Sequence, residues 1–532
     1  FIQASKATFV LSLLLAAVGT YVYGCLLLDN RRSALVAAAA YLFSPYLLLV
    51  IYERGAAAEL LALGLLPWLF WSLHRVVTEE GRNSFWLAGL LVGLLVLAHN
   101  ITALFVLPAA LFYAFVLALG SQRQHRLRFL FAGVFFGISL TAFYWLPAIG
   151  ELRYTRADQY MLSEASDVRS NLIHWQKLFQ FELLFDYWGE ERFRIVWWQA
   201  LLGILGMTAL PLQAAKQRHA LGALAALFLI ALLLQLEVSR LFWEIVPLVR
   251  YIQFSWRLLG LASFCAAILM GSLFQLPILG HRIGWGLAIA LIAAIAVMAS
   301  ANLQPSRSPI WYTIGEDEIG LPDLFARGRQ GFSLFTNYSP KWITGELSRP
   351  RPDSDPPFPR LTQPPLIEIA RAHPYQVDLR IQAAAPFTLR FHRVFFPGWR
   401  VSVDGQPVET RAEGSLGLVT ADLPAGDYAA SLRFGQTPLR SLADLWSIAA
   451  VLGGLAVWLA PWKRHRMHDQ MHYRVWVAAA LLISIAATWL ALRATPFAVF
   501  HRPTVVAVNF EDELQLLGFH LDKTSWEPGT PV

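Results

Sequence analysis

The feature that most constrains this sequence is a series of long apolar runs that contain few or no charged residues. A hydrocarbon layer of about 30 Å needs roughly 20 helical residues at a rise of about 1.5 Å each. The sequence therefore predicts an α-helical multispanning membrane protein rather than an ordinary soluble enzyme. Ten runs of the required length lie near 7–28, 33–51, 56–74, 129–149, 194–213, 220–236, 258–276, 283–300, 442–461 and 475–493.

The continuous apolar stretch 85–120 is too long for one straight span and is interrupted by His99 and Asn100. We expect it to fold as a hairpin, which raises the total to about 12 spans. Because the hairpin returns to the side it left, two full crossings and a re-entrant pair both remain open. The first arm, 85–98, is short, so the polar pair is expected to be recessed into the membrane, where it needs partners.

The charged residues are few and are concentrated in alternate loops. They make up 15% of the chain, against roughly 25% in globular proteins. The net charge of +7 could indicate a nucleic-acid partner, but six alternate connections hold 14 of the Lys and Arg residues and only four acids. These loops are expected to face the cytoplasm, so the basic excess reflects topology and no nucleic-acid partner is predicted.

The remaining connections are therefore expected to be extracytoplasmic, and they divide the chain into domains. Residues 1–300 form a polytopic membrane domain whose outer loop, 150–193, combines eight acids with many aromatics, as amphipathic interfacial helices do. A Pro-rich linker and a β-sandwich occupy 301–441, two further helices occupy 442–493, and 494–532 begins another outer β-unit.

The β-sandwich is predicted from alternation of polar and apolar residues with a period of two. At least six antiparallel strands are expected in LIEIAR, YQVDLRIQ, FTLRFHRVFF, WRVSVDG, LGLVTADL and DYAASLRF. The DG and AGD sequences between them are typical of tight turns. His392, Trp399 and Asp404 lie in this region, where structural roles are expected.

Motifs of soluble enzymes are absent from the sequence. It contains no dinucleotide fingerprint, no P-loop, no H-E-x-x-H and no G-x-S-x-G, so ATP-driven transport by this chain alone is excluded. Cys25 and Cys265 lie within apolar runs and are expected to be small core residues rather than zinc ligands or a disulfide. No metal site is predicted, and no cofactor is indicated.

The strongest candidate for chemistry is the short outer connection that contains Glu53, Arg54 and Glu59. Glu53 and Arg54 can neutralise each other, while Glu59 lies about one turn into the next helix. A carboxylate near hydrocarbon is costly unless it is paired or hydrated, which favours a polar cavity. Alternatively, the acids only complement the dipole of the helix N-terminus.

Two further polar positions lie at the same expected level. His99 could act as an acid or base and Asn100 could hold a hydroxyl group, although Asn100 could merely cap a helix that begins at Ile101. Arg257 begins an outward-to-inward span, where it could bind a lipid phosphate with help from Arg250 and from stacking on Trp256. Snorkelling of an Arg at a helix end explains the same pattern.

The acids Asp158, Asp167, Glu182 and Asp186 of the outer loop could bind a cation or sugar hydroxyls. A solvated acidic face is the commoner explanation of such a pattern. We therefore do not predict a binding site from these four residues.

Three membrane motifs carry a resemblance to a known family. FSPYLLLVIYERGAAAELLALGLLPW, AHNITALFVLPAALFYA and YIQFSWRLLG resemble bacterial membrane proteins that contain a 6-pyruvoyl-tetrahydropterin-synthase-related domain. Those proteins are similar to integral-membrane GT-C glycosyltransferases rather than to the soluble pterin enzyme. FFPGWRVSVDGQPVE and LPAGDY are similar to the outer β-domain of YfhO-like membrane proteins.

The resemblance implies a multi-pass protein of the bacterial cell membrane that uses a polyprenyl-phosphate-linked sugar on the extracytoplasmic side. It carries over Glu53, Arg54, Glu59, His99, Asn100 and Arg257 as candidate substrate-binding residues. In that superfamily an acid in the first outer loop usually activates the acceptor. Since Phe1 is expected on the outer side, we expect an odd number of spans, and this acid, to precede it.

Two alternatives to glycosyl transfer remain. A non-catalytic protein could bind or move a lipid-linked saccharide and use the β-sandwich for docking, without an acidic base. A secondary transporter is weaker, since membrane-buried acids other than Glu59 are nearly absent and no matching broken helices are evident.

Overall fold

The computed structural model describes most of the helical part of the chain and most of the strands. The described residues are 2–52, 54–79, 82–156, 167–180, 194–246, 249–276, 281–301, 339–343, 363–373, 375–459, 509–510 and 514–515.

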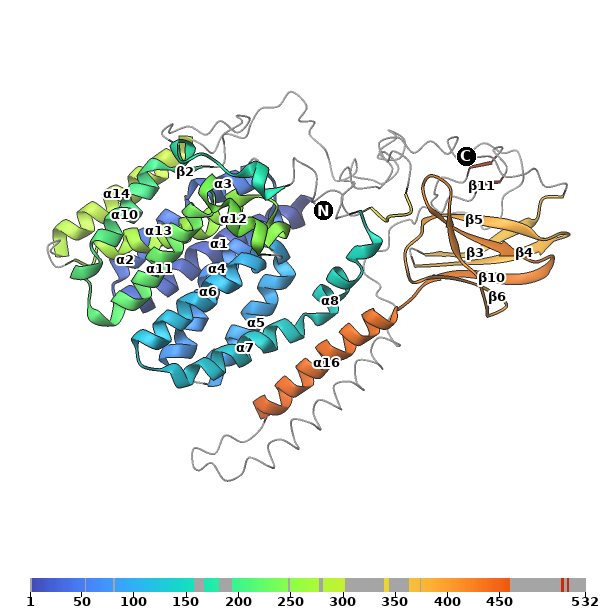
Figure 1. Ribbon diagram of the computed structural model, residues 1–532, viewed down its shortest axis with the longest axis horizontal. Helices are drawn as coiled ribbons and strands as arrows, with labels where there is room; N and C mark the ends of the chain where they lie inside the picture. The colour runs from blue at the N-terminus through green and yellow to red at the C-terminus, as the bar shows by residue number, and fades with distance from the viewer. Residues whose placement is uncertain are drawn as a thin grey trace. The chain divides into compact units, whose positions relative to one another are not determined.

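The chain divides into two compact units (Figure 1). The helical unit comprises Phe1–Trp145, Met161–Thr313 and Ala450–Val477. The β unit comprises Leu146–Tyr160, Ile314–Ala449 and Ala478–Val532.

The helical unit is built from long apolar helices joined by short turns. Its helices are α1 (Ile2–Leu28), α2 (Arg31–Leu42), α3 (Pro45–Tyr52), α4 (Ala57–Thr78), α5 (Arg82–Ala98), α6 (Asn100–Gly120), α7 (Leu127–Leu140), α10 (Trp197–Thr208), α11 (Ala215–Leu233), α12 (Arg240–Ile245), α13 (Leu259–Leu273) and α14 (His281–Ala301). Single 3-10 turns connect them, namely η1 (Gln124–Arg126), η3 (Val168–Asn171), η4 (Trp175–Lys177), η5 (Leu210–Leu212), η6 (Glu237–Ser239), η7 (Val249–Ile252) and η8 (Ser255–Leu258).

Among the described residues, eight helices are long and apolar enough to cross a membrane, or nine if a bent pair counts as one span. The bent pair is α7 with α8 (Ala142–Gly150), which turn by 70° at Thr141. As expected, 85–120 forms a hairpin, α5 and α6. The total of about 12 spans is not confirmed, and the expected span at 475–493 lies outside the described residues.

One expected straight span is wrong. The run 194–213 forms a short strand, β2 (Ile195–Val196), then the 12-residue helix α10 and then η5. A helix of 12 residues is about 18 Å long, which is too short to cross the hydrocarbon layer. The apolar count could not reveal this because β2 pairs with β1 (Phe179–Gln180) of the preceding loop, and that pairing removes residues from the helix.

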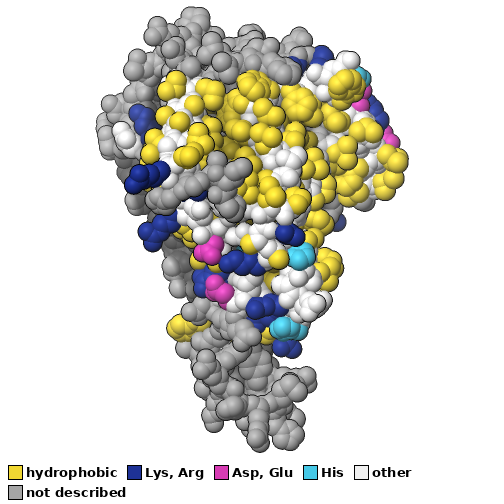
Figure 2. All heavy atoms as spheres, turned by 90° about the vertical axis from the view of Figure 1, so that its left-hand side faces the viewer, with side chains coloured by type: hydrophobic (Ala, Val, Ile, Leu, Met, Phe, Trp, Pro, Cys, Tyr) yellow, Lys and Arg dark blue, Asp and Glu magenta, His cyan; other side chains and the backbone are white. Residues whose placement is uncertain are grey.

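The core of the helical unit is centred on α13. Its sequence LGLASFCAAILMGSL is apolar on every side, and it packs against α2, α10 and α11. Helices that pack closely need small residues at their contact. The contact between α5 and α7 is an example, because a Cβ on Gly137 would clash with the carbonyl oxygen of Gly89. By contrast, α14 is largely exposed. Hydrophobic side chains cover a broad area of the face shown in Figure 2, and charged side chains lie around the edges of this area.

At the end of the bundle that carries the basic loops, arginines bind the last carbonyl groups of helices. Arg126 donates to Val76 O (3.1 Å) at the end of α4, and Arg32 donates to Phe274 O (3.1 Å) after α13. Cations are favourable at helix C-termini, where four carbonyls lack partners within the helix. The basic residues of these loops therefore stabilise the bundle as well as predicting its orientation.

The described part of the β unit has two larger antiparallel sheets. One has the order β3-β4-β10-β6-β7 and the other β5-β9-β8. Their inward-facing side chains, such as Ile381, Phe391 and Leu432, form one apolar core. The strands are β3 (Leu366–His373), β4 (Gln376–Ala383), β5 (Phe387–Val394), β6 (Trp399–Val403), β7 (Gln406–Val408), β8 (Arg411–Glu413), β9 (Leu418–Leu423) and β10 (Gly426–Phe434).

The six expected strands are all present as β3, β4, β5, β6, β9 and β10, while β7 and β8 were not predicted. The DG turn joins β6 to β7, and both Asp404 and Gly405 have positive φ (44° and 81°), as a two-residue hairpin turn requires. Asp404 also accepts a hydrogen bond from Ala429 N (2.9 Å). Trp399 packs edge-on against Phe434, so these two residues have the structural roles expected.

Most of the Pro-rich linker and the side chain of His392 lie outside the described residues. Of the last expected β-unit, the structure describes only a short antiparallel pair, β11 (Asn509–Phe510) and β12 (Leu514–Gln515).

Candidate functional site

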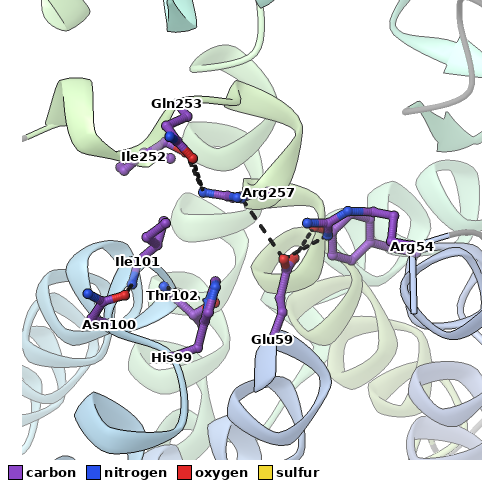
Figure 3. A network of polar contacts seen from close by, with 10 residues as sticks. Arg54, Glu59, His99, Asn100, Ile101, Thr102, Ile252, Gln253 and Arg257 are labelled. Atoms are coloured by element: carbon purple, nitrogen blue, oxygen red, sulfur yellow. Dashed lines mark hydrogen bonds and ion pairs between the residues drawn. The ribbon is translucent and has the colours of Figure 1, made fainter. Parts of the chain in front are cut away.

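Three turns meet at the end of the helical unit opposite the basic loops, which we call the site end. They are the α3–α4 turn, the α5–α6 turn and the segment η7–η8 that leads into α13. Because successive helices run in alternate directions, segments far apart in the sequence arrive at the same level. The turns bring together Arg54 and Glu59, His99, and Arg257 (Figure 3).

Glu59 is the centre of this group, which we call the Glu59 cluster. It lies in the first turn of α4 and is only 2% exposed. Tyr46 donates its hydroxyl to Oε1 (2.5 Å), and Arg54 Nη1 binds Oε2 (2.7 Å). Arg257 Nε lies 3.9 Å from the same Oε2. Burial of a carboxylate here is tolerated because two guanidinium groups and a hydroxyl surround it.

Among the residues that the structure describes, the positive charges of the cluster outnumber the negative ones. Two arginines face one carboxylate, and His99 adds no compensating negative charge, so the described residues leave an excess of one positive charge. Both arginines are mostly buried, at 18% and 8% side-chain exposure. An excess charge in a poorly hydrated place is costly unless an anion completes it.

Aromatic rings form one wall of the cluster. The guanidinium of Arg54 lies 4.6 Å from the ring centre of Trp256, and Trp256 stacks on Phe254 at 4.9 Å. Arg257 lies 5.3 Å from the ring centre of Phe254. Rings in this position hold the guanidinium planes in place and leave their edges available for hydrogen bonds.

Arg257 is oriented from the segment that precedes it. Its Nη1 donates to Ile252 O (2.8 Å) and to Gln253 Oε1 (3.4 Å). Gln253 has a φ of +64°, a left-handed conformation that is unfavourable for a residue with a Cβ. Strain of this kind persists where the surroundings impose it, and it is common at functional sites.

His99 is the N-cap of α6. Its Nδ1 accepts a hydrogen bond from Thr102 N (3.3 Å) and lies 2.8 Å from Thr102 Oγ1. A ring nitrogen that accepts from an N–H carries no proton, so the neutral ring is protonated at Nε2. Burial lowers the pKa of His99 to about 4, although the nearby Glu59 acts in the opposite direction. At neutral pH His99 is therefore uncharged and can donate a hydrogen bond from Nε2.

Asn100 does not belong to the cluster. It is the first residue of α6, it is exposed, and its Oδ1 accepts from Ile101 N (2.9 Å). Figure 3 shows it on the far side of His99 from Glu59. The interpretation of Asn100 as the helix cap is also wrong, since His99 occupies that position.

The structure thus brings Arg54, Glu59 and Arg257 into contact with His99 beside them, whereas Glu53 and the side chain of Arg250 lie outside the described residues. Arg54 pairs with Glu59. Sequence reasoning missed Tyr46, an ordinary residue of an apolar run, and the anchoring role of Gln253. The one available signal for Gln253 was its position four residues before Arg257 in the same motif.

The acidic outer loop shows no binding site in its described part. Asp167 caps η3 and pairs with Arg169 (2.5 Å), whose hydrogen bonds hold the pKa of Asp167 below its usual range. Asp158, Glu182 and Asp186 lie outside the described residues. Within the part of the chain that the structure describes, no group of three or more His, Cys, Asp or Glu residues could hold a metal ion.

Comparison with known proteins places the chain in a family. A search of curated proteins finds none that matches this chain. Residues 1–306, more than half of the chain and all of the Glu59 cluster, match the family described as the 6-pyruvoyl-tetrahydropterin synthase related domain, a membrane protein family. The chain therefore belongs to this family of membrane proteins.

Proposed function

We propose that this protein is an integral-membrane glycosyltransferase of the GT-C type, which moves a sugar from a polyprenyl-phosphate donor to an acceptor on the extracytoplasmic side of the bacterial cell membrane. The observation that carries the proposal is the pair of mostly buried arginines, Arg54 and Arg257, that converge on Glu59 at the site end of the bundle. The proposal includes a bundle of about 12 spans and an extracytoplasmic β-sandwich formed by the two sheets.

A phosphate ester is the ligand whose chemistry suits the cluster best. Guanidinium groups bind phosphate oxygens through two parallel hydrogen bonds, and Arg54 and Arg257 approach Glu59 from different turns. One phosphate would share these arginines with Glu59 and supply the missing negative charge. The Nε2–H of His99 would add a neutral donor beside them.

In the proposed reaction, an acceptor hydroxyl attacks C1 of the sugar while the bond between C1 and the phosphate oxygen breaks. Polyprenyl phosphate leaves with the bonding electron pair, and a base takes the proton of the hydroxyl. Arg54 and Arg257 stabilise the leaving anion as its charge develops. Glu59 holds the arginines and is not the base, because Tyr46 and Arg54 already occupy its two oxygens. The base therefore comes from outside the cluster.

The same observation supports a second candidate function. Among the residues that the structure describes, Glu59 is the one carboxylate of the cluster, and it is fully engaged. A protein that only binds or moves a lipid-linked saccharide needs the phosphate-binding arginines but no base. The alternative is thus a non-catalytic carrier that uses the same site.

The test is to measure binding and transfer by the full chain in lipid nanodiscs. We expect long-chain polyprenyl phosphate to bind and the uncharged polyprenol not to bind. Arg257→Ala should weaken phosphate binding by about 100-fold, and Arg257→Lys should recover only part of it, because Lys cannot form the paired hydrogen bonds. Arg218→Ala is the matched control, since Arg218 binds backbone carbonyls at the basic end.

Transfer from polyprenyl-phospho-sugars separates the two candidates. Turnover that is lost in Arg257→Ala supports the transferase. Phosphate-dependent binding without turnover, across the available sugars and acceptors, supports the carrier. Equal binding of polyprenyl phosphate by the native chain and Arg257→Ala would overturn both.

A further inference from the structure

An exposed row of apolar side chains lies beside the Glu59 cluster, on η6 and α12. Val238, Leu241 and Ile245 are 75%, 64% and 66% exposed, and Phe242 is also exposed. Their spacing of three, four and seven residues places them on one side of a helical turn. We call these four residues the apolar ridge.

The protein fixes the direction in which the ridge points. Trp243, on the other side of α12, is buried and donates from Nε1 to Leu234 O (3.0 Å) and Ser239 Oγ (3.1 Å). Arg240, at the start of α12, interacts electrostatically with Asp167. Hydrogen bonds from Arg169 are the main cause of the low pKa of Asp167, and Arg240 adds to them. The ridge thus faces outward because Trp243, on the opposite side of α12, is held inward.

Exposed apolar side chains also lie on the candidate membrane span that precedes the ridge, α11. Leu229, Ile230 and Leu233, in the last turns of that span, are exposed apolar residues. η6 follows α11 after only three residues, so the ridge lies just beyond the end of a membrane-spanning helix. An apolar stripe with charged flanks at this level is typical of a segment that lies in the membrane interface.

The ridge is also connected to the cluster. α12 packs against η7, and the carbonyl of Ile252, the last residue of η7, anchors Arg257. α12 also packs against η3, and the carbonyl of Asn171, the last residue of η3, accepts a hydrogen bond from Ser255 Oγ (2.9 Å). Two short paths therefore lead from the ridge to the residues that position Arg257.

We propose that the apolar ridge is inserted into the membrane leaflet at the site end and forms the side from which the hydrocarbon tail of a phosphate-bearing lipid approaches the Glu59 cluster. The insertion stands independently of the proposed function. The approach of the tail rests on the proposed function, because it assumes that the cluster binds a lipid phosphate.

Insertion is tested by attaching spin labels to single cysteines in a chain that carries Cys25→Ser and Cys265→Ala, reconstituted in nanodiscs. Labels at Val238→Cys, Leu241→Cys and Ile245→Cys should be reached by oxygen more readily than by a water-soluble nickel chelate. Glu237→Cys and Glu244→Cys, on the charged flanks of the same turns, are the controls and should show the reverse. The insertion would be overturned if the nickel chelate reached the ridge labels as readily as it reaches the control labels. It would also be overturned if neither oxygen nor the chelate reached the ridge labels.

The approach of the tail is tested with two phosphates that differ only in chain length, a long-chain polyprenyl phosphate and a short-chain isoprenyl phosphate. Leu241→Asn combined with Ile245→Asn should weaken binding of the long chain about tenfold and leave the short chain unchanged. Leu229→Asn combined with Leu233→Asn, on α11, is the matched control. Equal loss for both chains, or no loss for either, would overturn the approach.

The two measurements distinguish failure of the proposed function from failure of the membrane insertion. If neither phosphate binds to the native chain, the proposed function fails and the approach of the tail fails with it. The spin-label result then still decides whether the ridge lies in the membrane.

Discussion

Two buried carboxylates in this protein have arginine partners, yet they differ in how completely they are neutralised. In the β unit, Glu151 Oε2 accepts from Arg440 Nε (3.2 Å) and Nη2 (2.8 Å), and Thr437 Oγ1 donates to Oε1 (3.0 Å). One arginine therefore matches one carboxylate. In the helical unit, two arginines surround Glu59, and the second stands 3.9 Å away.

The remaining contacts of Arg440 complete the contrast. It also donates to Gly435 O (3.3 Å) and Pro397 O (3.1 Å), and its guanidinium covers the ring of Phe434 at 4.8 Å. This pair is neutral, closely spaced and fully hydrogen-bonded, so it joins the residues after α8 to the start of α16 (Pro438–Leu459) as a structural link. Around Glu59, by contrast, two described arginines share one carboxylate, and the second of them lies 3.9 Å from it. Under the proposed function, that difference distinguishes the phosphate-binding site from a structural ion pair.

Removal of each carboxylate in turn tests whether the two sites differ as described. Glu59→Ala leaves two buried guanidinium groups without a carboxylate, and we expect it to lower the free energy of unfolding by about 3–5 kcal/mol. Glu151→Ala leaves one such group and should cost less. The measurement is denaturant titration of the full chain in detergent micelles, followed by circular dichroism.

Double substitutions provide the control. In Glu151→Gln with Arg440→Met, both charges of a neutral pair are gone, so most of the stability should return. In Glu59→Gln with Arg54→Met, the charge of Arg257 stays in place, so the loss should persist. Equal recovery at both places would show that the Glu59 cluster is an ordinary neutral ion pair.

The sequence was sufficient to find the charged members of the cluster but not their partners. Arg54, Glu59 and Arg257 stand out because ionisable residues are rare among apolar runs, and alternation of the spans places them at one end. Tyr46 gives no such signal, because a tyrosine in an apolar run is equally suited to packing. The exchange of roles between His99 and Asn100 depends on where α6 begins, and one residue at a helix boundary cannot be resolved from a pattern.

In the β unit, too, some features could be predicted from the sequence and others could not. Six strands of five residues or more were found from their alternation, because each exposes several alternate positions. β7 and β8 have three residues each, which is too few to establish a period of two. The pair of Glu151 and Arg440 joins residues that are 289 positions apart, and nothing local to either residue predicts the other.

The pH dependence of stability sharpens the assignment of His99. Its pKa in the folded chain is about 4, below the ordinary value of 6.5, so the unfolded chain binds the proton more readily between these values. Stability is therefore fully present above pH 6.5 and is lost as the pH falls through 4. The expected contribution at pH 5 is a loss of about 2 kcal/mol.

His99→Asn is the matched variant, because Asn is a favourable N-cap that does not titrate in this range. The difference between the two chains removes the contribution of other acidic groups. It should be near zero at pH 7.5 and should grow on acidification in favour of the variant. A difference that does not change with pH would show that His99 is solvated and titrates normally.

The smallest expected effect concerns the strain next to Arg257, which has no counterpart at the saturated Glu151 pair. Gln253→Ala and Gln253→Gly both remove the contact with Arg257 Nη1, but only glycine adopts the φ of +64° without strain. The glycine variant should therefore be more stable than the alanine variant by about 1 kcal/mol. Both should bind polyprenyl phosphate several-fold more weakly than the native chain, since Arg257 has lost one of its anchors. Stability measured in micelles and binding measured in nanodiscs give the two values separately. If the glycine variant gains stability and binds as tightly as the native chain, the strain has no role in positioning Arg257, and the looseness of the second arginine is the whole difference between the two carboxylates.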